Sequence, residues 1–243
     1  MSDYPHRETT AYGTRARTAD IDQGLRAYML KVYNYMMAGV ALTGVVAYGV
    51  YYMAATNPAF AQLIYNSPLK YVIMFAPLVM VFAMSAMVNK MSYGATQLAF
   101  WGFAALMGAS LSFIFIAYGG QSIARVFFIT AAAFGGLSLY GYTTKKDLSG
   151  WGTFLIMGLI GLIIASIVNI FVGSTALQFA VSVLGVLIFS GLTAYDTQRI
   201  KEMYHINHGA AALGKMAIMG ALSLYLDFIN LFMSLLSLFG SSD

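Results

Sequence analysis

Two aspartates occur in or beside long apolar runs, where a carboxylate can bind a proton or a cation. Asp227 lies within LYLDFINLFMSLL (residues 224–236), and Asp196 ends the run GLTAYD (residues 191–196). A charged Asp at the centre of a bilayer costs about 2.5–3.5 kcal/mol on insertion scales. We therefore expect both carboxylates to face protein or water. They are the candidate ion and proton site, and the candidate ligands of any bound metal ion.

Small and polar residues continue from both aspartates at helical spacing. Steps of three and four from Asp227 define one helix face, which comprises Gly220, Ser223, Asn230, Ser234 and Ser237. The same steps back from Asp196 define a second face, which comprises Thr193, Phe189, Gly185 and Ser182. Such faces allow close helix packing. Ser223, Asn230 and Thr193 are the predicted supporting residues of the site.

The two carboxylates differ in their expected depth. The last apolar run begins near Lys215, which places Asp227 about 18 Å along that helix at about 1.5 Å per residue. Asp196 lies near the end of the preceding run. We expect tilt or an unwound segment to bring the two together. A pair that shares a proton responds to pH in a range where a free Asp does not.

The composition is that of a membrane protein. Hydrophobic residues make up 60% of the chain and charged residues 9%, whereas soluble domains carry about 25% charged residues. A membrane-spanning helix needs about 20 mostly apolar residues. Seven segments meet this criterion, at residues 32–53, 69–88, 97–118, 122–142, 152–172, 176–196 and 216–239. The predicted fold is an all-α bundle of seven transmembrane helices. Because lipid cannot stabilise the polar face around Asp227, we expect the seventh helix to be central.

Basic residues predict the orientation and the domain limits. The N-terminal tail and the loops on its side hold eleven of the 13 Lys and Arg residues, and the opposite side holds only Lys70 and Arg125. Cytoplasmic loops carry such an excess, so we predict a cytoplasmic N-terminus and an outside C-terminus. Residues 1–31 form the cytoplasmic tail and residues 32–239 the membrane domain. Within the tail, DIDQGLRAYMLKVY is either an interfacial helix or an extension of the first span.

The sequence supports an enzymatic function less well than an ion or proton site. An intramembrane aspartyl hydrolase would use a Tyr-Asp pair, which Tyr195 and Asp196 supply, together with glycines before the second Asp. Leu224, Tyr225 and Leu226 stand there instead. All histidines fall outside the predicted spans, which disfavours a serine protease. We predict no enzymatic activity, no cofactor and no nucleic-acid partner, and keep the hydrolase as a second alternative.

The two acidic segments, GLTAYDTQRIKEMY and ALSLYLDFINLFMSLL, resemble the bacterial branch of the transmembrane Bax inhibitor motif family. The segment from MGASLSFIF to GWGTFL is also similar, so the resemblance runs from about residue 20 to the end. It implies a central last helix wrapped by six others, and a pH-sensitive calcium leak that senses pH through a pair of aspartates. Asp196 and Asp227 match that pair.

The resemblance also implies a basic partner for the first Asp. Family members often carry an Arg near the inner end of the second helix, where this sequence has Met87, and Lys90 in the next turn is a candidate substitute. The predicted function is a pH-sensitive cation leak of the inner membrane, with calcium as the transported ion. Some bacterial relatives are described as substrates or modulators of an ATP-dependent membrane protease, so a protease-interacting protein is the alternative.

Overall fold

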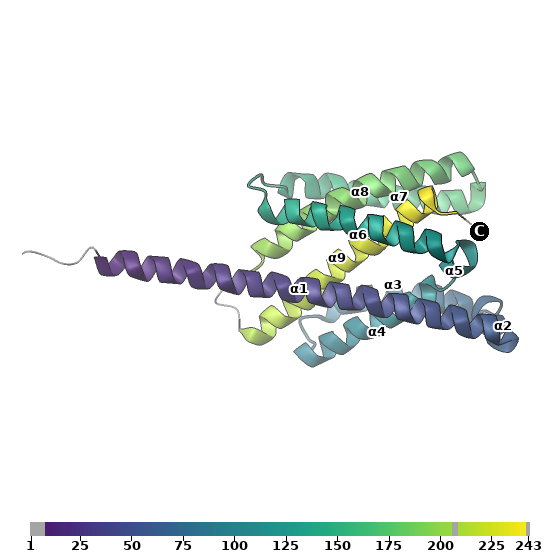
Figure 1. Cartoon of the computed structure of the whole chain (residues 1–243), viewed down its shortest axis with the longest axis horizontal. Helices are drawn as coiled ribbons and strands as arrows, with labels where there is room; N and C mark the ends of the chain where they lie inside the picture. Colours follow the sequence, from purple (N-terminus) through teal and green to yellow (C-terminus); the bar gives the residue numbers. More distant parts are fainter. Residues whose placement is uncertain (1–7, 206–208, 242–243) are drawn as a thin grey trace, which may run out of the picture.

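The computed structural model describes residues 8–205 and 209–241, with side chains from residue 22 onward. Within these ranges the chain is entirely helical (Figure 1). The helices are α1 (Glu8–Thr56), α2 (Pro58–Tyr65), α3 (Leu69–Met87), α4 (Tyr93–Leu111), α5 (Ile114–Ala117), α6 (Gly120–Thr143), α7 (Ser149–Val172), α8 (Thr175–Glu202) and α9 (Ala210–Phe239).

Seven helical segments of the described chain are long and apolar enough to cross a membrane, which confirms the predicted number. They are the Asp22–Thr56 part of α1, α3, the Tyr93–Ala117 segment of α4 and α5, and α6 to α9. The chain is therefore a polytopic helical membrane protein. The helix before the first span and the span itself form one uninterrupted helix, α1, which extends well beyond the rest of the bundle (Figure 1).

Polar residues at the breaks explain why the spans end where they do. The Asn57 side chain accepts hydrogen bonds from the first N–H groups of α2, and Ser92 and Ser174 do the same for α4 and α8. Such caps satisfy N–H groups that have no partner within a helix. Gly173 ends α7 at φ 65°, a left-handed conformation that glycine adopts without strain.

The helices form two groups joined by α9. Helices α1, α3 and α4 pack together, as do α6, α7 and α8. Helix α9 runs obliquely between the groups and packs against α1 and α4 on one side and against α6 and α8 on the other (Figure 1). It is also the most buried of the seven spans. This arrangement determines what surrounds Asp227.

Candidate ion and proton site

Asp227 is enclosed by the bundle. Only 5% of its surface is exposed, and its Oδ2 atom has no hydrogen-bond partner among the described residues. Burying an ionised carboxylate without a partner is strongly unfavourable. Each such buried group in a protein needs an explanation, such as a proton, an ion or a water molecule. Asp227 therefore has the environment expected of a residue that binds something other than its own neighbours.

Close contacts between α8 and α9 define their register. Gly220 lies against Ile200, and Gly185 lies against Ser234. Nearer the other end, Ser182 Oγ donates a hydrogen bond to Ser237 Oγ at 2.9 Å.

Because the two helices run antiparallel, these contacts place Thr193 opposite Asp227 and Asp196 opposite Ser223. The two aspartates are thus offset by about one helical turn, which is about 6 Å along the axis. Like charges on one helix contact repel each other, so the ionisation of each carboxylate affects that of the other.

In the structure, the two aspartates differ less in depth than the sequence predicted. No unwound segment is needed to bring them together. Helix α9 begins at Ala210 rather than near Lys215, and its first turns project past the end of α8 at Glu202. Both helices are continuous through the two aspartates. Apolar residues alone place the start of α9 too late in the sequence, so they do not reveal the overhang.

Two of the predicted supporting residues, Asn230 and Thr193, bond within their own helices. The Asn230 amide donates to the Leu226 carbonyl at 2.8 Å. The Thr193 hydroxyl donates to the Phe189 carbonyl at 2.7 Å. Ser223 is half-buried and faces the register position of Asp196. Their remaining oxygen lone pairs are available to a proton, a cation or water.

The structure does not bring the expected basic partner to the pair. Met87 and Lys90 are both exposed at the end of α3, and α3 packs against α2 and α4 rather than against α8. The basic residue near Asp196 in the sequence is Arg199, one turn further along α8. A basic residue in the same helix was visible in the sequence at a spacing of three, but the sequence analysis did not use it.

Two further sets of polar residues were missed. Lys215 donates to the carbonyls of Val88 and Met91, at 3.2 Å each, and so joins α9 to the end of α3. Lys201 donates to the Tyr142 carbonyl at the end of α6. These lysines were counted only as orientation signals, although a Lys at a helix end also bonds the free carbonyls of neighbouring helices.

The second missed set is a line of hydroxyl groups that reaches α8 beside Asp196. The Tyr33 hydroxyl lies 2.7 Å from Ser138 Oγ, and Ser138 Oγ lies 2.9 Å from Thr197 Oγ1. Thr197 in turn donates to the Thr193 carbonyl at 2.7 Å. The line links α1, α6 and α8. Single hydroxyl residues in apolar spans were the only signal for it in the sequence.

The chemistry available to the site is proton exchange and weak cation binding. Two coupled carboxylates bind and release protons as a unit. A calcium ion takes six to eight oxygen ligands, and the described residues contain no cluster of three or more metal-binding side chains. Asp196 and Asp227 would therefore supply only part of such a ligand set.

Comparison with known proteins identifies the family. The family model described as "Inhibitor of apoptosis-promoting Bax1" matches residues 25–243. A protein of Caulobacter vibrioides is 51% identical over 233 residues, which cover 91% of both chains. A protein of Rickettsia prowazekii is 45% identical over 241 residues and 99% of both chains. The inner membrane protein YbhL of Escherichia coli K12 is 47% identical over 221 residues, 90% of this chain and 93% of its own. The chain belongs to the Bax inhibitor-1 family of membrane proteins.

Proposed function

We propose that this protein is a pH-sensitive cation leak of the inner membrane, with calcium as the transported ion, gated by protonation of Asp196 and Asp227. The observation that carries the proposal is the buried Oδ2 of Asp227, which has no partner among the described residues and lies within the electric field of Asp196. Ionisable residues within membrane spans usually mark ion pathways or proton relays, because they contribute little to the stability of the fold.

The proposed architecture places α9 as the central helix of the pore. Its contacts with four other helices and its burial support this role. The excess of Lys and Arg on one side supports a cytoplasmic N-terminus and an outside C-terminus. The inner-membrane location is supported by the relative YbhL, which is described as an inner membrane protein.

The proposed mechanism follows from the charge of the pair. At low pH the two carboxylates share or carry protons, attract cations weakly and let α8 and α9 pack tightly. At higher pH both carboxylates become anionic. They then repel one another across the α8–α9 contact and attract cations to it. Two like charges on neighbouring helices in a medium of low polarity interact strongly. Cation flux is therefore expected to rise with pH.

The test is calcium flux into proteoliposomes over a pH series. Wild type is compared with Asp196→Asn and Asp227→Asn, and Asp147→Asn is the matched control because Asp147 is an exposed loop carboxylate. We expect the two membrane variants to lose the pH dependence and the control to keep it. If wild type conducts and both variants follow its pH profile, the gating role is wrong. If wild type does not conduct at any pH, conduction itself is wrong.

A role as partner or modulator of a membrane protease is the second candidate. The observation that favours it is the projection of α1 beyond the bundle (Figure 1), since such a helix offers a surface to another protein. Deleting residues 1–21 separates the candidates. A modulator loses its effect on the protease after the deletion, whereas a leak keeps its conductance.

A further inference from the structure

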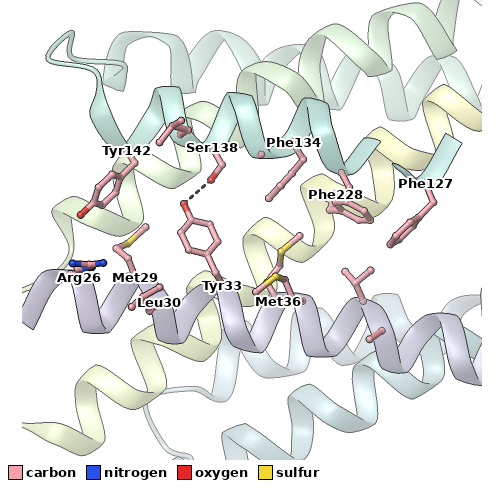
Figure 2. Close-up of a pocket in the computed structure, with 16 residues that line it drawn as sticks. Arg26, Met29, Leu30, Tyr33, Met36, Phe127, Phe134, Ser138, Tyr142 and Phe228 are labelled. Atoms are coloured by element: carbon pink, nitrogen blue, oxygen red, sulfur yellow. Dashed lines mark hydrogen bonds between the residues drawn. The ribbon is translucent and has the colours of Figure 1, made fainter. Parts of the chain in front are cut away.

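A large groove lies between α1 and α6 (Figure 2). Its volume is about 890 Å³. Helix α1 packs against α4 and α9, and α6 packs against α8 and α9, so the space between α1 and α6 stays open and Phe228 of α9 lies at its base. The hydrogen bond between Tyr33 and Ser138 joins the two walls partway along the groove (Figure 2).

The walls of the groove are apolar and one end is cationic. Met29, Met36 and Val40 line it from α1, and Phe127, Ala131 and Phe134 line it from α6. Arg26 is the only charged residue among the lining residues, and it lies at the same end as Tyr142 (Figure 2). No described carboxylate forms an ion pair with Arg26.

The length of the groove matches one leaflet of a bilayer. Its lining on α1 runs from Arg26 to Ala41, and fifteen residues of helix extend about 22 Å. One leaflet including its headgroups is about 20–22 Å thick. Arg26 precedes the apolar run that begins at residue 32, so it lies at headgroup level, and Ala41 lies near the middle of that run.

We propose that the groove between α1 and α6 binds an anionic phospholipid, with its phosphate on Arg26 and one acyl chain along the groove. The groove lies between two membrane-spanning helices, and lipid is the solvent around such helices. Arginine recognises phosphate by paired, charge-assisted hydrogen bonds, and an anionic headgroup lacks the choline cation that would be repelled by Arg26. The bound chain contacts Phe228, the neighbour of Asp227, but the proposal does not depend on ion conduction.

The apolar part of the groove is tested with two adjacent glycines of α6. Gly135 lines the groove and Gly136 does not. An added Cβ meets no atom within 4 Å at either position, so a side chain leaves the helix without a clash at both, and leucine favours the helix more than glycine does. Native mass spectrometry of the purified full-length protein with added phosphatidylglycerol measures binding. We expect Gly135→Leu to weaken binding about tenfold, which is the loss of about one well-placed contact, and Gly136→Leu to match wild type.

The charged end is tested with Arg26→Gln, and Arg125→Gln is the control because Arg125 is an exposed arginine of α6 outside the groove. Wild type and the control are expected to bind phosphatidylglycerol about tenfold more tightly than phosphatidylcholine, and Arg26→Gln to lose that preference. Equal binding of the two lipids by wild type overturns the proposal. So does equal retention by the two glycine variants. A change in oligomeric state in Gly135→Leu with unchanged lipid binding shows that the groove holds protein instead.

Discussion

Helix α9 has two polar groups buried two residues apart, and they differ in hydrogen bonding. The Tyr225 hydroxyl lies 2.6 Å from Thr43 Oγ1, which donates to the Ala104 carbonyl at 2.8 Å. Tyr225 thereby joins α9 to α1 and α4. Asp227 faces α8, and its Oδ2 has no partner among the described residues. Burial alone therefore does not reveal what a polar group does. The first group holds helices together, whereas the second has an oxygen that bonds no described residue.

The two groups also differ in the residues that pack around them. The ring of Tyr225 is held edge-on by Phe100 and Phe103, with centroids 6.5 Å and 5.2 Å away. The α8 side of α9 is built from small residues and hydroxyls, such as Gly185 against Ser234. Aromatic rings in a close-packed core resist displacement, whereas hydroxyl groups can rotate. Asp196 and Asp227 both lie on the α8–α9 contact, so a change in their charge acts on this contact.

The largest expected effect is on the aromatic side. Tyr225→Ala removes a fully buried ring and leaves the Thr43 hydroxyl without one of its partners. We expect the free energy of unfolding to fall by about 3–5 kcal/mol, the usual range for large-to-small changes of buried aromatics. Thermal or denaturant unfolding in detergent micelles measures it. Phe128→Ala is the control because Phe128 is largely exposed, and a comparable loss there would contradict the expected difference.

Two glycine contacts compare the rigidity of the two sides. A Cβ at Gly108 would lie 2.6 Å from the Thr43 carbonyl oxygen, which is backbone, whereas a Cβ at Gly185 would lie 2.5 Å from the rotatable Ser234 hydroxyl. Gly108→Ala is expected to destabilise by about 1–3 kcal/mol, as overpacking does. Gly185→Ala is expected to lose less. Equal losses in unfolding experiments would show that the α8–α9 contact is as rigid as the α1–α4 contact. Gly44→Ala is the control, since nothing lies near its added Cβ.

The sequence predicted the spans well because they depend on local information. Apolar length identified seven helices. Polar residues such as Asn57 and Ser174 lie at the breaks and cap the helices that follow. Helical spacing also predicted the face of α9 that carries Asp227, because Gly220 and Ser234, seven residues to either side, both contact α8. Periodicity along one helix is sufficient for such predictions.

The register and the contacts between helices could not be predicted from the sequence. The overhang of α9 and its register against α8 depend on contacts between residues distant in the chain, such as Ser182 with Ser237. The bond between Tyr225 and Thr43 is likewise non-local, and a Tyr in an apolar helix gives no sign of its partner. The groove between α1 and α6 arises because both helices pack against α9, which no single-helix pattern contains.

Smaller substitutions at the two polar groups sharpen the comparison. Tyr225→Phe removes a hydroxyl that is hydrogen-bonded, so we expect a loss of about 1 kcal/mol in the free energy of unfolding. Asp227→Asn removes an ionisable group without a partner for Oδ2, so stability at neutral pH is expected to stay the same or rise. Unfolding of both variants in the same detergent tests the pair. A larger loss in Asp227→Asn than in Tyr225→Phe would mean that the carboxylate is bonded after all.

The smallest expected effect concerns an acid outside the membrane spans. Asp147 is fully exposed in the loop between α6 and α7, and its Oδ1 accepts a hydrogen bond from the Ser149 backbone N–H at 2.8 Å. That bond holds the pKa of Asp147 below its ordinary value. Since the folded state favours the carboxylate, the contribution to stability is present at neutral pH and above the ordinary Asp pKa of about 3.9. It is lost as the pH falls through the lowered pKa.

Asp147→Ala is therefore expected to be slightly less stable than wild type at neutral pH and equal to it in strong acid, while Asp147→Asn, which keeps an acceptor oxygen, loses less. Unfolding temperatures over a pH series measure both. A deficit in the alanine variant that persists into acid would mean that chain conformation, and not the charge of the carboxylate, sets the effect. A deficit that fades shows an acid whose titration follows from one local bond. Asp227 has no such bond on Oδ2 among the described residues, so the comparison is between an acid with a local hydrogen-bond donor and an acid without one on that oxygen.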